Sequence, residues 1–107
     1  MSRLAGPPES KWLAEVSRRA RGWGWRVYHT LNSLGSAKGF PDLVMVRPPR
    51  LIVAELKSDA GKVRPEQLEW LDDLRSCGVE VYLWRPADVQ IVMEILFQKD
   101  RPPLGGR

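Results

Sequence analysis

GFPDLVMVRPPRLIVAELK, residues 39–57, is the stretch that decides the fold, because two apolar runs flank a pair of prolines in it. Residues 42–47 and 51–57 are rich in aliphatic and β-branched side chains, so each run predicts a short strand. Pro48-Pro49-Arg50 predicts the turn between them, since proline interrupts a strand ladder. We therefore expect an antiparallel hairpin over this stretch.

Upstream of the hairpin, the sequence predicts one helix and one further strand. Pro7-Pro8 followed by Glu9 is typical of a helix start. Apolar residues then recur at helical spacing, namely Trp12, Val16, Ala20 and Trp23. Residues 25–30 hold aromatic and β-branched side chains, which favours a strand. Residues 31–39 contain serine, asparagine and glycine and are typical of a loop.

Downstream of the hairpin, the pattern predicts a helix, a strand and a last helix. Pro65 is well placed to begin a helix over residues 65–77. Its expected buried stripe consists of Leu68, Leu71 and Leu74. Residues 79–84 predict a fourth strand, and Pro86 then opens the last helix. The residues expected to face inward from that helix are Val89, Val92, Met93 and Leu96.

The element order αβββαβα indicates an α/β fold. A helix between the strands at 51–57 and 79–84 implies that they are parallel and joined by a right-handed crossover. We expect a small mixed β-sheet flanked by helices, in one domain over residues 1–98. Residues 99–107, with paired prolines and glycines, are expected to form a flexible tail.

The composition is that of an ordinary globular chain with excess positive charge. The 107 residues leave room for one domain with a modest core. Lys and Arg outnumber Asp and Glu by 17 to 13. This excess fits a polyanionic partner such as DNA, and it fits equally well a surface charge that only aids solubility.

The sequence carries no evident membrane or secretion signal. No apolar run reaches the roughly 18 to 20 residues that a membrane helix needs, and the amino terminus lacks an apolar stretch typical of a signal peptide. Cys77 is the only cysteine, which excludes an internal disulfide. We therefore expect a cytoplasmic protein with no membrane partner.

Asp42, Glu55 and Lys57 are the residues most suggestive of chemistry. Side chains alternate between the faces of a strand, so Glu55 and Lys57 point the same way while Leu56 points into the opposite layer. If the two strands pair as a hairpin, Asp42 at the start of one lies near Glu55 at the end of the other. Two carboxylates, with the backbone carbonyl of Leu56, suit Mg²⁺, and a lysine can orient or deprotonate an attacking water. On these residues alone, a solvated strand with a weak surface ion pair is the simpler interpretation.

The arrangement around these residues resembles the VRR-NUC branch of the PD-(D/E)XK nucleases. The resemblance extends from about Glu9 to Leu96. It is carried by Glu9, Gly24-Trp25, Tyr28-His29-Thr30, Gly39-Phe40-Pro41-Asp42-Leu43, Ala54-Glu55-Leu56-Lys57, Gln67, Trp70-Leu71 and the stretch from Gly78 to Pro86. Each piece alone is a weak signal, whereas their order and spacing together are fairly specific.

The resemblance implies a restriction-endonuclease-like fold and a DNA endonuclease that uses Mg²⁺ or Mn²⁺. Asp42 and Glu55 would bind the metal, Lys57 would be the catalytic lysine, and Gln67 would belong to the same site. Glu9 matches a glutamate that completes the metal site in related nucleases, with Glu15 on the same helix as the rival. Members of this minimal size resemble Holliday-junction resolvases in fold and look like proteins of a bacterial or phage-infected cell.

Residues 29–38 offer candidate DNA contacts. His29, the only histidine, precedes a loop that contains Ser33, Ser36 and Lys38. A structural role for His29 and an ordinary polar loop are equally compatible with the sequence. We expect DNA, preferably branched, as the substrate and a homodimer as the working unit. Two alternatives stay open: a DNA-binding module that does not cut, and an interaction protein whose charges serve only the surface.

Overall fold

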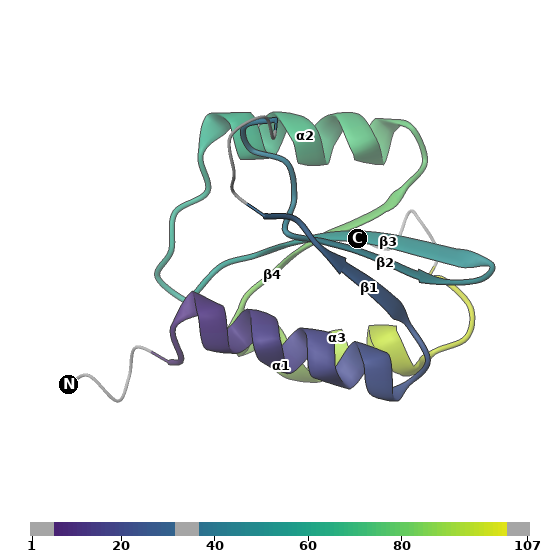
Figure 1. The fold of residues 1–107 in the computed structure, drawn as a ribbon. Helices are drawn as coiled ribbons and strands as arrows, with labels where there is room; N and C mark the ends of the chain where they lie inside the picture. The colour runs from purple at the N-terminus through teal and green to yellow at the C-terminus, as the bar shows by residue number, and fades with distance from the viewer. Residues whose placement is uncertain (1–5, 32–36, 103–107) are drawn as a thin grey trace.

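The computed structural model describes residues 6–31 and 37–102 and has the expected order of elements (Figure 1). They are α1 (Glu9–Gly22), β1 (Arg26–His29), β2 (Leu43–Arg47), β3 (Arg50–Leu56), α2 (Pro65–Ser76), β4 (Glu80–Trp84), the short 3₁₀ helix η2 (Pro86–Asp88) and α3 (Val89–Phe97). Within those residues, no helix is long and apolar enough to cross a membrane.

The four strands form one mixed sheet in the order β1-β2-β3-β4. β2 is antiparallel to both β1 and β3, whereas β3 and β4 are parallel, with α2 in the crossover between them. The predicted hairpin and crossover are therefore confirmed. The turn of the hairpin is shorter than expected. Arg50 begins β3 rather than ending the turn, and its side chain is buried because it pairs with Glu80 of β4.

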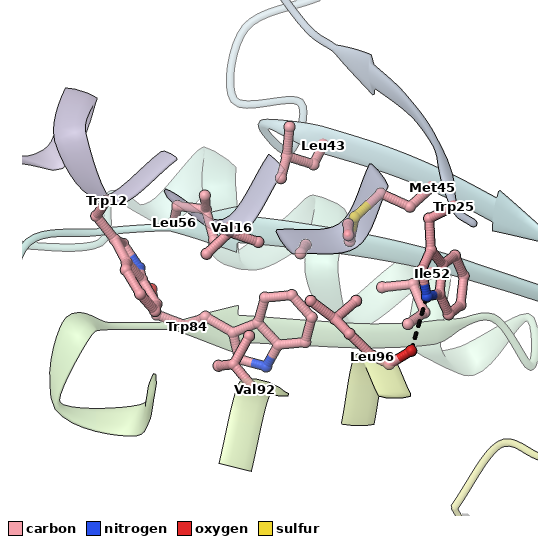
Figure 2. Packing of buried hydrophobic residues seen from close by; sticks show 12 residues of the cluster. Trp12, Val16, Trp25, Leu43, Met45, Ile52, Leu56, Trp84, Val92 and Leu96 are labelled. Carbon is pink, nitrogen blue, oxygen red and sulfur yellow. Dashed lines mark hydrogen bonds between the residues drawn. The ribbon is translucent and has the colours of Figure 1, made fainter. Parts of the chain in front are cut away.

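Helices cover both faces of this sheet, with α1 and α3 on one side and α2 on the other (Figure 1). The larger apolar cluster lies on the α1/α3 side (Figure 2). Its buried members are Trp12, Val16, Ala20, Trp25, Leu43, Met45, Ile52, Ala54, Leu56, Trp84, Val92 and Leu96. The indole N–H of Trp12 donates to the carbonyl of Trp84 at 3.0 Å, and that of Trp25 to the carbonyl of Leu96 at 2.8 Å. Both large rings are thus buried with their polar group satisfied.

The α2 side has a smaller apolar cluster, and each side of the sheet has one difference from the predicted core. Val53, Leu71 and Val81 are its buried members. Leu68 was expected in the buried stripe but is 46% exposed, because Gln67 takes the inward position one residue earlier. On the other side of the sheet, Val89 was likewise expected to face inward but is 37% exposed at the start of α3.

Candidate active site

The sheet brings Asp42 and Glu55 together where β2 begins and β3 ends. Leu43 pairs with Ala54 in the hairpin, so extending this register by one residue sets Asp42 opposite Glu55. Both side chains face α2, because Val44 and Val53, two residues along each strand, pack in the α2-side cluster. Leu56 points the other way, into the α1/α3 cluster. The face predicted for each of these side chains is confirmed.

Asp42 is fixed by hydrogen bonds to both neighbouring strands. Its Oδ2 accepts from the backbone N–H of Leu56 at 2.8 Å, and its carbonyl accepts from Thr30 N at 2.8 Å. The same register sets Pro41 opposite Leu56, and proline has no N–H to donate. Since the N–H and C=O of one strand residue point to the same side, the Leu56 carbonyl also faces Asp42 without a ladder donor from Pro41.

Glu55 is a buried carboxylate with an incomplete set of partners. Its side chain is only 2% exposed. Oε2 accepts from Gln67 Nε2 at 2.9 Å and lies 3.7 Å from Lys57 Nζ. Oε1 is buried and has no hydrogen-bond partner among the described residues. Burial and then the charges of Asp42 and Glu9 raise the pKa of Glu55 to about 7, against the opposing effect of Lys57.

Gln67 holds Glu55 from the first turn of α2. While its Nε2 donates to Glu55, its Oε1 accepts from the backbone N–H of Arg64 at 2.9 Å. Both ends of the amide are therefore used, and their hydrogen bonds fix which end faces Glu55. The residue is only 7% exposed. Gln67 is therefore not a solvent-exposed polar residue at the helix start.

The loop that leads into Asp42 packs against the start of α2. Gly39 has a φ of +84°, and a Cβ there would lie 2.8 Å from the backbone carbon of Glu66. Phe40 packs edge-on against Trp70, with ring centroids 4.9 Å apart. Lys38 lies at the same place, highly exposed, with Nζ 3.8 Å from Glu66 Oε2. Close backbone contact at Gly39 thus sets the path of the chain into the site.

Of the two glutamates of α1, Glu9 is the one that acts on Glu55. Glu15 is engaged by Arg18 and by Arg19, whose Nε lies 3.1 Å from Glu15 Oε2. Glu9 is exposed at the first residue of the helix, and its charge contributes to the raised pKa of Glu55. Across residues 6–31 and 37–102, however, no three His, Cys, Asp or Glu side chains lie close enough to form a metal-binding group. The close acidic set is therefore the pair Asp42 and Glu55.

Two of the four predicted DNA contacts, His29 and Lys38, fall on described residues, and they lie on different sides of the sheet. His29 pairs with Leu43, and since paired residues share a face, its side chain lies on the α1/α3 side, opposite Glu55. It is exposed at the end of β1. Ser33 and Ser36 fall outside the described residues. Among the expected contacts, the structure thus places Lys38 on the side of the site formed by α2.

The oxygens at this site fit a hard divalent cation. Mg²⁺ and Mn²⁺ prefer carboxylate and carbonyl oxygens, and Asp42, Glu55 and the Leu56 carbonyl supply these. The observation that favours a ligand is Oε1 of Glu55, which has no donor within residues 6–31 and 37–102, because a buried carboxylate oxygen without a donor is costly.

One residue beside the site was missed from the sequence. The guanidinium of Arg85, just after β4, donates to carbonyls of the turn that follows Lys57. A single arginine before a proline carries no signal of such a role, because its acceptors are backbone atoms more than twenty residues away.

Comparisons with family models and with solved structures agree on one family. The family model described as VRR-NUC domain matches residues 9–88. A solved structure titled "VRR_NUC domain" is 25% identical, with a TM-score of 0.67 over 80% of this chain and 94% of that one. A second, titled "VRR_NUC domain protein", is 21% identical, with a TM-score of 0.62 over 90% and 93% of the two chains. A search of curated proteins found no match.

Proposed function

Because the chain belongs to the VRR-NUC family of the PD-(D/E)XK nuclease superfamily, we propose that it is a DNA endonuclease that depends on a divalent metal. The observation that carries this proposal is the environment of the Glu55 carboxylate. Glu55 is a buried carboxylate beside a second one, Asp42, with one oxygen unpartnered among the described residues and a lysine 3.7 Å from the other. A purely structural carboxylate has no need of these neighbours.

Asp42, Glu55 and the Leu56 carbonyl would hold Mg²⁺ or Mn²⁺. Glu9, which lies outside this close set, is the further carboxylate that the family resemblance implies. The bound cation would lower the pKa of water and neutralise charge on the phosphate. Gln67 keeps Glu55 oriented by donating to Oε2, which leaves Oε1 available. The backbone N–H of Leu56 does the same for Asp42. The chain thus orients both acidic ligands before substrate arrives.

Lys57 is the group we assign to the reacting phosphate. Its side chain is only 11% exposed, and its ammonium lies beside Glu55. In this position it can orient the attacking water and stabilise the negative charge that develops on the phosphate oxygens. Because the surroundings exclude most solvent, each of these interactions is stronger than it would be at the surface.

We propose branched DNA as the preferred substrate. Within residues 6–31 and 37–102, every helix and strand belongs to the sheet or to the helices that cover it, which favours recognition through the phosphate backbone and DNA shape. Its net charge of +4 supports such contacts. We assign Lys38, which is exposed next to Glu66, to DNA on its position, and His29, Ser33 and Ser36 on their place in the sequence before Asp42.

A homodimer would suit this substrate. Two active sites related by a two-fold axis would cut symmetric strands of a junction, and a core of this size gains stability from a partner. Sedimentation equilibrium tests this directly. A monomer that retains junction cleavage at the same concentration would exclude the dimer as the working unit.

The test is cleavage of labelled four-way-junction, flap, single-stranded and duplex DNA, with and without Mg²⁺ or Mn²⁺. We expect cutting only with metal, and a loss of about 100-fold or more in Lys57→Ala, because the variant lacks the group that stabilises the transition state. Lys99→Ala removes the same charge at an exposed position beyond α3 and should cut like the wild type. Absence of cutting on every substrate, with DNA still bound, would instead support a binding module that does not cut.

A further inference from the structure

The turn that follows Lys57 is held by Arg85, the residue directly after β4. Ser58 to Gly61 form the turn, in which Gly61 N donates to the Ser58 carbonyl at 3.1 Å. Arg85 Nη1 donates to the carbonyls of Ser58 and Gly61, both at 2.7 Å, and to that of Asp59 at 3.3 Å. Three carbonyl oxygens converge on one guanidinium nitrogen, so a permanent positive charge satisfies dipoles that would otherwise repel one another.

A second contact ties the same turn to η2, which follows Arg85. Asp59 Oδ1 accepts from the backbone N–H of Ala87 at 2.9 Å. Arg85 itself is fixed because its backbone N–H donates to Asp88 Oδ2 at 2.9 Å. The segment between β4 and α3 therefore fixes the turn at several points, and the hydrogen bond from Arg85 to Asp88 of η2 lies within that segment.

The turn lies against the side chain of Lys57. A Cβ on Gly61 would be 3.5 Å from Lys57 Cδ and 3.0 Å from Ser58 Oγ, so the aliphatic part of the lysine packs beside this glycine. Lys57 N also donates to the carbonyl of Trp84 at 3.1 Å, the residue before Arg85. The backbone of the lysine is thus held by β4, and its side chain is confined by the turn that Arg85 holds.

We propose that Arg85 is a positioning residue, which sets the Lys57 ammonium beside Glu55 through the turn of Ser58 to Gly61. This inference rests on the proposed nuclease function. A lysine side chain has several rotatable bonds, so confinement of its aliphatic part fixes where the ammonium lies. Arg85 touches no reacting group itself, and its effect should fall on the rate of the chemical step rather than on DNA binding.

Arg85→Ala separates positioning from general stabilisation when it is compared with Arg101→Ala. Arg101 Nη1 also donates to a backbone carbonyl, that of Gly78 at 3.0 Å, at the other end of β4. In single-turnover cleavage we expect the rate to fall about 10- to 100-fold in Arg85→Ala, the effect of a catalytic group displaced by a fraction of an ångström to 1 Å. The DNA concentration for half-saturation should stay within about 2-fold, because no phosphate contact is lost. Arg101→Ala should cleave at the wild-type rate.

Chemical rescue and a conservative variant supply the readouts that a merely structural role would not move. Free guanidinium at a concentration below denaturation should restore part of the rate in Arg85→Ala and none in Lys57→Ala. Ammonium should restore less, because it lacks the planar geometry of the missing group. Arg85→Lys should fall between the wild type and Arg85→Ala.

Amide hydrogen exchange at Gly61 tests the inference without any cleavage. Its N–H is bonded within the turn, so exchange should accelerate in Arg85→Ala while that of Leu56, bonded to Asp42, stays unchanged. Unchanged Gly61 exchange, or a cleavage rate in Arg85→Ala equal to that of Arg101→Ala, would overturn the proposal. A wild type that cuts no DNA, with Gly61 exchange still dependent on Arg85, would overturn the nuclease function and leave the turn contact established.

Discussion

Strand β3 carries a buried charged side chain near each of its ends, and the two differ in how completely their hydrogen bonds and charges are satisfied. At the start of the strand, Arg50 is fully enclosed, and its Nε and Nη2 donate to the two carboxylate oxygens of Glu80 at 3.2 and 2.5 Å. Its Nη1 donates to the carbonyls of Ile95 and Gln98. Tyr82 donates its hydroxyl to Glu80 Oε2 at 2.7 Å. Each charge at this end has an opposite charge and further hydrogen bonds.

Glu55, near the other end of the strand, is just as buried but is left incomplete. Its one hydrogen-bond donor among the described side chains is Gln67, and Oε1 has none. Asp42 and Glu9 add negative charge nearby. Lys57 offsets this only in part, since the pKa of Glu55 still rises to about 7.

The difference separates an end of the strand that suits a structural role from an end that suits the proposed metal site. A buried ion pair with all its hydrogen bonds satisfied is specific and rigid, and loss of one partner strands the other. A buried carboxylate with an unfilled oxygen costs the folded state free energy that a bound cation can recover. The fold therefore keeps an unfavourable electrostatic environment at Glu55, whereas Arg50 at the start of β3 is fully paired.

The largest effect on stability should come from loss of the ion pair between Arg50 and Glu80. Glu80→Ala leaves Arg50 buried without a counter-charge, and we expect the free energy of unfolding to fall by about 3 to 5 kcal/mol. Urea denaturation followed by tryptophan fluorescence measures this. Asp72→Ala is the control, because Asp72 pairs with Arg75 at 3.4 Å on the exposed surface and should cost less than about 1 kcal/mol. Equal losses in the two variants would mean that the Arg50–Glu80 pair is not structural.

The sequence predicts one of these two ends and not the other. Glu55 and Lys57 share a face because strand side chains alternate, and Asp42 lies near them because a hairpin sets the start of one strand beside the end of the other. These are local rules, which a sequence displays directly. The pairing of Arg50 with Glu80 depends on residues thirty positions apart that meet only across the crossover. An arginine after two prolines was therefore interpreted as part of a turn.

The inward face of α2 could not be predicted from polarity either. Its buried positions are Gln67 and Leu71, with Leu74 half-buried, at a spacing of four and three residues. That is an ordinary helical stripe, except that a glutamine occupies the first position. Apolar periodicity therefore favoured Leu68 as the inward residue. Gln67 is inward because Glu55 lies beneath it and needs a donor.

Glu55 should make the free energy of unfolding depend on pH in the opposite sense from a carboxylate whose pKa is lowered by folding. Because the pKa of Glu55 is raised from 4.5 to about 7, the folded protein keeps a proton in that interval that the unfolded chain has released. Stability should then decrease as pH rises from about 4.5 to 7, by up to about 3 kcal/mol. Glu55→Gln should remove this slope and be more stable than the wild type at about pH 8, since the amide can still accept from Gln67. Urea denaturation at a series of pH values, in the presence of a chelator, measures both.

Added metal is a second test of the same two proteins, the wild type and Glu55→Gln. Under the proposed metal site, Mn²⁺ should stabilise the wild type at about pH 8, because the cation would bind the ionised carboxylates of the folded state alone. It should have little effect on Glu55→Gln, which has lost one of the two close carboxylates. Parallel pH slopes in the two proteins would show that Glu55 is not the group under strain.

The smallest effect should come from Gln67, whose two ends can be tested separately. Gln67→Ala removes both hydrogen bonds, and we expect the single-turnover rate to fall about 10-fold, the lower part of what a hydrogen bond to a charged group contributes. Gln67→Glu keeps an acceptor for Arg64 N but replaces the donor to Glu55 with a like charge. If the role of Gln67 is to hold Glu55, the glutamate variant should cut more slowly than the alanine variant near neutral pH. If its role is only to cap α2, the glutamate variant should cut at the wild-type rate, and the comparison between the two ends of β3 would then rest on Oε1 alone.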